Sequence, residues 1–180
     1  EGILSPFTFI VGCIVFLNPL CAGASVTVIP RDMIENPLAL AAFIDRMHIS
    51  QIFMPPSVLK LFKPTGNSLR VVTTGSERVS AVSSRDYSIY NLYGMSETCA
   101  AVTAFPIDKP YHNTPIGRAM EGCAVYLLDE NGREADEGEI CVAGHFMTGY
   151  IGMPEKTAAV KLINPYLAKD GHEYMIRTGD

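Results

Sequence analysis

The sequence predicts an α/β fold in which a mostly parallel sheet is flanked by helices and followed by a smaller, β-rich, barrel-like subdomain. Up to about residue 115, short β-branched segments alternate with stretches of helical periodicity, as in a parallel sheet. Beyond residue 116, turn residues separate the apolar segments, which is typical of antiparallel strands. We therefore expect an α/β subdomain at residues 1–115 and a β-rich subdomain at residues 116–180.

The composition indicates a globular protein. The chain has 180 residues, of which 48% are hydrophobic, and this is enough to bury a core. A net charge of -5 and the absence of a Lys/Arg-rich run argue against a nucleic acid or a membrane as partner. The five cysteines are widely spread without a C-x-x-C pair, which favours a reduced, cytoplasmic location.

The first 30 residues are apolar and almost free of charge. Proline and glycine residues interrupt this run and no basic segment precedes it, which argues against a membrane span or a secretory signal. We expect a buried helix at residues 7–20 and a core strand at residues 25–29. Because the chain begins with Glu1 rather than Met, we also expect it to be part of a longer protein.

The next elements continue the alternation of helix and strand. Asn36-Pro37 predicts a helix start, because Asn is a favoured N-cap and Pro fits the first turn, and this helix should reach about Met47. The following predicted elements are a strand at 49–54, a short helix at 58–62, and a strand at 69–74 that ends at Gly75.

The remaining predicted elements are mostly strands. Two apolar segments, at 88–90 and 100–105, lie on either side of a polar loop at 91–98. The β-rich subdomain is expected to contain strands at 123–128 and 139–143, a turn at 129–132, and a helix that begins at Pro154 and reaches Leu162.

The polar loop at residues 91–98 combines an aromatic ring, a glycine, a hydroxyl and a carboxylate. Binding residues are commonly presented on such loops between buried strands. A ring such as Tyr93 can stack on a purine, Asn91 can bond to a base edge, Ser96 can donate to a phosphate, and Glu97 can hold magnesium. The loop therefore predicts a nucleotide and metal site, although Tyr93 could also be a core aromatic and Glu97 a helix N-terminal carboxylate.

Three motifs, in this order, carry a family resemblance. Residues 91–98 resemble N-x-Y-G-P-T-E, residues 138–144 with Gly149-Tyr150 resemble G-E-L-x-I-x-G…G-Y, and residues 177–180 resemble the end of Y-R-T-G-D. Shorter matches to G-G-E, P-I-G-R and N-P-F lie at residues 73–77, 115–118 and 164–166. The chain thus resembles the adenylate-forming, or AMP-binding, enzymes, and most closely an adenylation domain of a nonribosomal peptide synthetase. The resemblance implies a fragment of the family's large N-terminal domain.

The resemblance implies a reaction in which ATP activates a small carboxylic or amino acid as an acyl adenylate. The acyl group then passes to the phosphopantetheine thiol of a carrier protein, or to CoA. Two anions must approach each other in the first step, so magnesium and hydrogen-bond donors are needed to screen their charges. The implied catalytic residues are Ser96, on the α-phosphate, and Glu97, on the metal. The other residues implied for binding ATP or AMP are Gly75, Ser76, Glu77, Asn91, Tyr93, Gly94, Met95 and, on the ribose hydroxyls, Asp180.

The chain departs from the synthetase pattern at two places. Met95 and Ser96 replace the usual Pro and Thr, as in acyl-CoA and aryl-acid ligases. Ile10 stands where synthetases have the Asp that pairs with the substrate ammonium. The implied acid pocket is mostly apolar and consists of Ile10, Val11, Ile14, Phe53, Val72, Thr74, Leu92, Ala100 and Ala101. Such a pocket favours a small hydrophobic acid, or one without an α-amino group.

Two family features are absent from residues 1–180, namely the phosphate-gripping loop and the catalytic lysine. We therefore expect an internal fragment that is inactive alone. Residues 144–149 have P-loop glycine spacing, but Tyr150-Ile151 replace Lys-Ser/Thr, so a P-loop is not predicted. Similarly, Thr98 replaces the second glycine of a hydrolase G-x-S-x-G elbow. The alternatives are a fragment of an acyl-CoA or aryl-acid-CoA ligase, or a non-catalytic domain that binds a nucleotide or a partner.

Overall fold

The computed structural model describes residues 1–180, apart from the side chains of Ala100 and Ala168. The chain forms two compact units. The first contains Glu1–Tyr93 and Ala104–Gly117, and the second contains Gly94–Thr103 and Arg118–Asp180. Residues 94–103, which are predicted to lie in the first subdomain, belong to the second unit.

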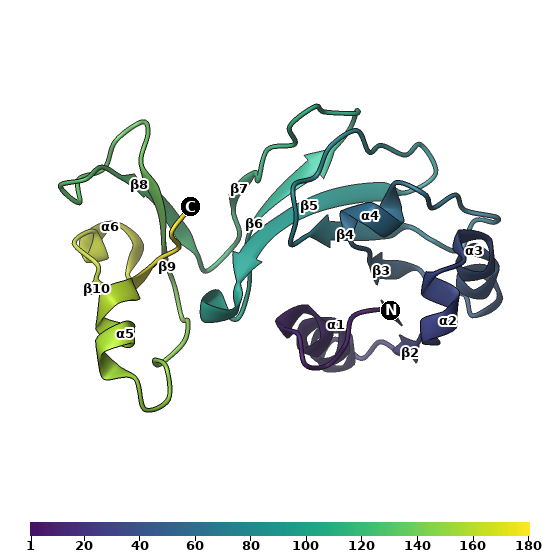
Figure 1. Ribbon diagram of the computed structural model, residues 1–180, viewed down its shortest axis with the longest axis horizontal. Helices are drawn as coiled ribbons and strands as arrows, with labels where there is room; N and C mark the ends of the chain where they lie inside the picture. Colours follow the sequence, from purple (N-terminus) through teal and green to yellow (C-terminus); the bar gives the residue numbers. More distant parts are fainter. The chain divides into compact units, whose positions relative to one another are not determined.

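A sheet with the strand order β2-β1-β3-β4-β5-β6-β7 forms the centre of the first unit (Figure 1). The first five strands in this order, β2, β1, β3, β4 and β5, pair in parallel. Strand β6 runs back alongside β5 (Figure 1). The last strand, β7, belongs to the second unit. The strands are β1 (Gly2–Ile3), β2 (Thr27–Val28), β3 (Gln51–Phe53), β4 (Val71–Gly75), β5 (Ser88–Met95), β6 (Ala100–Ile107) and β7 (Arg118–Ala119).

Four helices belong to the first unit: α1 (Ile10–Cys21), α2 (Arg31–Ile34), α3 (Pro37–Arg46) and α4 (Pro56–Leu59). The start of α3 is as predicted, because Asn36 Oδ1 accepts a hydrogen bond of 3.1 Å from the N–H of Ala39. No helix among the described residues combines the length and the hydropathy needed to cross a bilayer.

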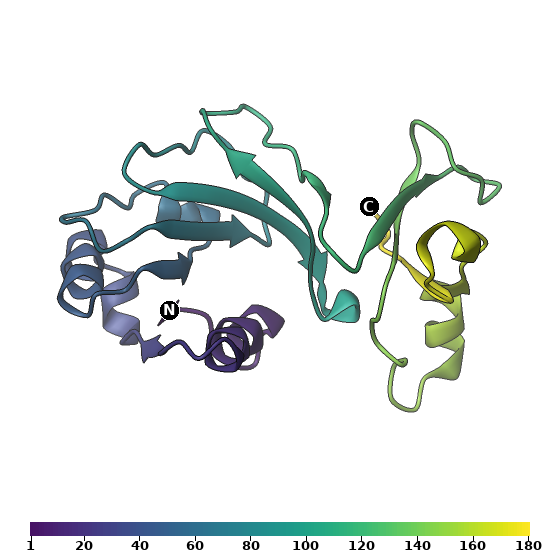
Figure 2. The same cartoon turned by 180° about the vertical axis from the view of Figure 1, so that it is seen from behind.

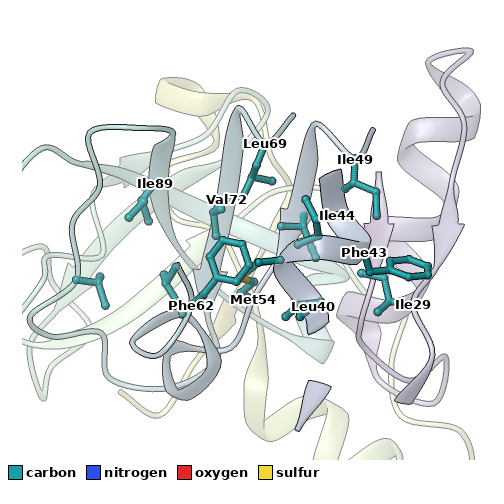
Figure 3. Close-up of a cluster of buried hydrophobic side chains, with 14 of the residues drawn as sticks. Ile29, Leu40, Phe43, Ile44, Ile49, Met54, Phe62, Leu69, Val72 and Ile89 are labelled. Atoms are coloured by element: carbon teal, nitrogen blue, oxygen red, sulfur yellow. The ribbon is translucent and has the colours of Figure 1, made fainter. Parts of the chain in front are cut away.

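Helices cover both faces of this sheet. Ile52 belongs to the main core, together with Leu40 and Ile44 of α3 (Figure 3). The next residue, Phe53, packs instead with Val15 of α1, because successive side chains of a strand point to opposite faces. The prediction of a mostly parallel sheet flanked by helices is confirmed.

An antiparallel sheet with the strand order β10-β11-β9-β8 forms the centre of the second unit. Its strands are β8 (Ala124–Leu128), β9 (Glu139–Ala143), β10 (Lys161–Ile163) and β11 (Tyr174–Arg177). Figure 2 shows its two helices, α5 (Pro154–Val160) and α6 (Leu167–Asp170), on one side of these strands. Tyr126, Cys141 and Met175 form its buried core.

The structure differs from the predicted elements at residues 91–98 and at the helix that follows Pro154. Residues 91–95 lie in β5 rather than in a loop, because Asn91 and Leu92 pair with the last residues of β4. Only Ser96–Thr98 form a turn, which is a short 3-10 helix. The helix that starts at Pro154 ends at Val160 and not at Leu162, because Lys161–Ile163 pair with β11.

We predict that Leu40→Ala lowers the free energy of unfolding by about 2–5 kcal/mol, because it leaves a cavity in the main core. Leu40 is fully buried, whereas Leu38 of the same helix is 72% exposed. Leu38→Ala is therefore the matched control and should change the free energy by less than about 0.5 kcal/mol. Urea denaturation followed by circular dichroism measures both values, and equal losses would contradict the assigned faces of α3.

Candidate nucleotide and acid site

A tight turn follows β4 in the first unit, at residues predicted to surround adenine. Gly75 is the last residue of β4 and pairs with Leu92 of the neighbouring parallel strand β5. Open α/β sheets bind ligands at the carboxyl ends of such strands. Gly75 has a φ of +156°, and a Cβ at this position would lie 2.2 Å from the carbonyl oxygen of Leu92. Only glycine fits this approach. Ser76 follows with a φ of +67°, and Ser76 and Glu77 are exposed.

The same edge of the sheet carries Asn91 and Tyr93. The Asn91 side chain is buried, and its Nδ2 donates a hydrogen bond of 2.8 Å to the carbonyl oxygen of Pro115. This bond holds the 115–117 segment beside β5. Tyr93 is half-buried. The structure therefore gathers Gly75, Asn91 and Tyr93 at one edge, and it gives Asn91 a structural contact that the sequence did not reveal.

The residues predicted for the acid pocket lie on two faces of the sheet. Val11 of α1 packs in one cluster with Phe53. Val72 pairs with Ile52 and belongs to the main core on the opposite face. Thr74 lies two residues further along β4 and so shares the face of Val72.

The hydroxyl of Thr74 is an unusual feature of that face. Thr74 is fully buried, and its Oγ1 has no hydrogen-bond partner among the described residues. Of the remaining pocket residues, Ile10, Ile14 and Leu92 are half-buried in the first unit, whereas Ala101 is half-buried in the second. The side chain of Ala100 lies outside the described residues.

The turn Ser96–Thr98 carries the predicted catalytic residues and lies in the second unit. Thr98 closes the turn, since its Oγ1 accepts a bond of 3.1 Å from the N–H of Met95 and donates one of 2.9 Å to the Met95 carbonyl oxygen. Gly94 and Ser96 are exposed, whereas Met95 and Glu97 are half-buried.

Glu97 is held at two points by one segment of the second unit. Tyr150 Oη donates a hydrogen bond of 2.6 Å to Glu97 Oε1, and the N–H of Met147 donates one of 3.1 Å to the Glu97 carbonyl oxygen. The bond to the Glu97 carboxylate raises the pKa of the Tyr150 phenol. Tyr150 is itself fixed by α5, because its N–H donates to Thr157 Oγ1 at 2.9 Å.

The contact between Tyr150 and Glu97 could not be expected from the sequence, in which Gly149-Tyr150 stands only as part of a motif. The spacing of 53 residues between Glu97 and Tyr150 gives no local signal of a contact. Gly149 beside it packs against α5, because a Cβ there would come within 2.8 Å of Thr157 Cγ2, and it gives no signal of the contact with Glu97 either.

Glu139 holds the segment that ends at Asp180. Its carboxylate accepts hydrogen bonds from the Arg177 guanidinium, including one of 2.8 Å from Nε, and one of 3.0 Å from the N–H of Gly179. The carbonyl oxygen of Asp180 accepts a bond of 3.0 Å from the N–H of Ile140. The backbone of the predicted ribose-binding residue is thus fixed at the start of β9, with its side chain exposed.

Glu97 is the carboxylate predicted to hold magnesium. Among the described residues, no group of three or more His, Cys, Asp or Glu side chains forms a metal-binding cluster. Magnesium is commonly bound by one or two carboxylates together with waters and substrate phosphates. A single positioned carboxylate such as Glu97 fits this mode of binding.

Comparison with known proteins identifies the family. A family model described as AMP-binding enzyme matches residues 3–151. The chain belongs to the AMP-binding enzyme family. It is similar to bacitracin synthase 1 of Bacillus licheniformis, at 33% identity over 166 residues that cover 89% of this chain and 3% of that protein.

Two further proteins are similar to this AMP-binding chain over almost its whole length. The D-alanine–D-alanyl carrier protein ligase of Lacticaseibacillus rhamnosus is 26% identical over 206 residues, which cover 100% of this chain and 40% of that protein. The crystal structure of CmiS6 matches with a TM-score of 0.85 at 25% identity, over 99% of this chain and 48% of that one. The chain therefore spans less than half the length of each of these relatives. The family predicted from the motifs is confirmed.

We predict that Glu139→Gln lowers stability at pH 7 by about 1 kcal/mol, the upper range for a partly exposed ion pair. The hydrogen bond from Arg177 lowers the pKa of Glu139 below its ordinary value of 4.5. A carboxyl group whose pKa is lower in the folded than in the unfolded state stabilises the folded protein at pH values above its unfolded-state pKa. This stabilisation is lost as the pH falls through the folded-state pKa. Below pH 4.5, the stability difference between the protein and the variant should therefore shrink.

Thermal unfolding from pH 7 to pH 3 measures this difference. The control is Glu137→Gln, which replaces an exposed carboxylate two residues earlier. This substitution should leave the stability nearly unchanged. A stability difference for Glu139→Gln that is constant across this pH range would show that the carboxylate charge contributes nothing.

Proposed function

We propose that this chain is part of an adenylation domain that activates a carboxylic acid with ATP as an acyl adenylate. The observation that carries the proposal is the turn Ser96–Thr98, which exposes a hydroxyl and holds the neighbouring Glu97 carboxylate by Tyr150 and Met147. Membership of the AMP-binding enzyme family supports the same reaction. The relatives' greater length means that the domain extends beyond these residues.

In this proposal, the nucleotide-binding residues have the roles that their motifs imply. In the first unit, Gly75, Ser76, Glu77, Asn91 and Tyr93 surround adenine. In the second, Gly94 and Met95 lead into the turn, Ser96 Oγ donates a hydrogen bond to the α-phosphate, and Asp180 accepts bonds from the ribose hydroxyls.

Glu97 acts on the metal. Its carboxylate binds magnesium, which when present screens the phosphate charges from the incoming carboxylate. The hydrogen bond from Tyr150 fixes one carboxylate oxygen, so that the side chain loses less freedom when it binds the metal. Tyr150 is therefore a positioning residue for Glu97.

The acid is bound by the apolar residues beside α1. Val11 and Phe53 share a cluster, and Ile10 lies at the first residue of the helix. Ile10 offers no negative charge to a substrate ammonium, so a hydroxy, keto, aryl or short-chain acid is favoured over an amino acid. The acyl group then passes to the phosphopantetheine thiol of a carrier protein. The carrier protein ligase among the relatives supports this acceptor.

Acid-dependent exchange of pyrophosphate into ATP tests the proposal, with a whole adenylation domain that contains residues 1–180. Exchange that depends on the acid and on magnesium is expected. Residues 1–180 alone should show none, because the family's phosphate loop and catalytic lysine supply positioning and charge stabilisation. If the whole domain binds ATP but no acid supports the exchange of pyrophosphate, the domain is a non-catalytic binding domain.

We predict that Glu97→Gln in the whole domain lowers the exchange rate by about tenfold or more, or roughly 1.4 kcal/mol in the barrier. Tyr150→Phe should act through Glu97. It should raise the magnesium concentration needed for half-maximal exchange by about tenfold, while the rate at saturating magnesium is largely retained.

The matched control is Tyr111→Phe, which removes another Tyr–carboxylate hydrogen bond, of 2.7 Å to Asp108. That bond is on the surface of the first unit, so its loss should leave the magnesium dependence unchanged. A magnesium titration of exchange separates the outcomes. If Tyr150→Phe lowers the rate equally at all magnesium concentrations, Tyr150 does not position a metal ligand.

We predict that Ile10→Asp shifts the preference of the whole domain toward amino acids. An ammonium buried beside Ile10 would be unpaired, which costs several kcal/mol in a dry pocket, or on the order of a hundredfold in preference. A carboxylate at the first turn of α1 is compatible with the helix dipole, so the variant should fold.

Exchange assays with pairs of amino and hydroxy acids that share a side chain measure the preference. Ile10→Asn is the control for polarity without charge and should produce a much smaller shift. A strong preference of the unmodified domain for an amino acid would show that Ile10 does not face the α-carbon.

A further inference from the structure

The second unit contains a cavity that the proposed nucleotide and acid sites do not use. Its volume is about 250 Å³, and it is lined by residues 144–148, Lys161, Tyr174 and Ile176. The loop 144–148 follows β9, Lys161 begins β10, and the other two residues belong to β11. All of these residues lie within one compact unit.

Lys161 places a positive charge at this cavity. Its Nζ donates hydrogen bonds of 3.3 Å and 3.2 Å to the carbonyl oxygens of Met147 and Thr148, and lies 4.6 Å from the centre of the Tyr174 ring. These neutral groups hold the ammonium without cancelling its charge. An ammonium has three N–H donors, so one donor remains for a further acceptor.

Within the part of the chain that the structure describes, Lys161 forms no ion pair with a carboxylate. The ion pairs among the described residues join Lys169 to Glu134 and Arg177 to Glu139. The lining of the cavity contains no Asp or Glu, whereas His145 and Thr148 add an imidazole and a hydroxyl. A half-buried cation without a counterion favours an anion in its vicinity.

The loop has the glycine spacing of a phosphate-binding loop but lacks the lysine that should follow it. Four residues separate Gly144 from Gly149, as in a phosphate-binding loop, and Tyr150 occupies the position of the lysine. In the folded unit, Lys161 of the next strand reaches the carbonyl groups of this loop instead. The Phe146 ring packs directly on Gly144, since a Cβ there would lie 2.5 Å from Phe146 Cζ.

We propose that this cavity, named here the Lys161 pocket, binds an oxyanion, either a carboxylate or a phosphate group. Lys161 donates its remaining N–H to the anion, and Thr148 and His145 are the polar groups of the wall. Phe146, Met147 and Ile176 supply an apolar wall for a short carbon chain or ring attached to the anion. The pocket does not depend on the adenylation reaction proposed above.

Titrations of the 180-residue chain, followed by ¹H–¹⁵N correlation spectra, test the proposal. The probes are inorganic phosphate and benzoate, each added at constant ionic strength, with chloride as the reference anion. Saturable shifts of the amides of residues 144–148 are expected for at least one probe. Tighter binding of phosphate would indicate a phosphorylated ligand, and tighter binding of benzoate an apolar carboxylate.

Lys161→Met keeps the aliphatic stem and removes the charge, and should weaken binding by about tenfold or more. Lys169→Met is the matched control, because it removes the same charge from an exposed lysine outside the pocket. The titration of the unmodified chain still locates the site if Lys161→Met does not fold. No saturable shift at residues 144–148 with either probe, or equal weakening in both variants, would overturn the proposal.

Discussion

The pairing of β4 with β5 is the constraint on which the arrangement of Gly75 and Asn91 in the first unit depends. The two strands are in register from Val71 and Ser88 to Gly75 and Leu92, so both reach the same edge of the sheet. Backbone hydrogen bonds fix this register, and the buried Val72 and Ile89 keep it from slipping, because a shift by one residue would turn one of these strands' side chains away from the main core. Gly75 can end the ladder only because it lacks a Cβ.

The second unit positions Glu97 by a different means. Here the carboxylate is held by a side chain from far along the chain, Tyr150, whose backbone is held in turn by Thr157 of α5. Each hydrogen bond restricts the next group, so the half-buried carboxylate is oriented before any ligand binds. Such preorganisation lowers the entropy lost on binding.

The loop that follows β9 connects two features of the second unit. Residues 144–148 line the Lys161 pocket, and Met147 within it also donates to the Glu97 backbone. The loop is fixed from one side by Lys161 and from the other by the turn at Glu97. Gly144 at its start packs against the Phe146 ring, and Gly149 directly after it packs against Thr157.

Local sequence determined much of the architecture. Asn36-Pro37 predicted the start of α3, and the β-branched run at 69–74 predicted β4, because capping and β propensity act over a few residues. The order of three short motifs likewise identified the family, and so the general fold. The loop predicted at 91–98 begins too early, because Asn91 and Leu92 pair with β4 and β5 continues to Met95.

Only the tertiary structure decided which distant residues meet. Neither the contact of Tyr150 with Glu97, nor that of Lys161 with the loop at 144–148, follows from local spacing. The same holds for the division of the predicted acid pocket, where Phe53 faces α1 and Val72 faces the main core. Strand register and side-chain alternation fix these positions, and both arise when separate segments pair. The sequence by itself therefore determined the elements and the family, whereas long-range packing decided how the side chains of the sites are arranged.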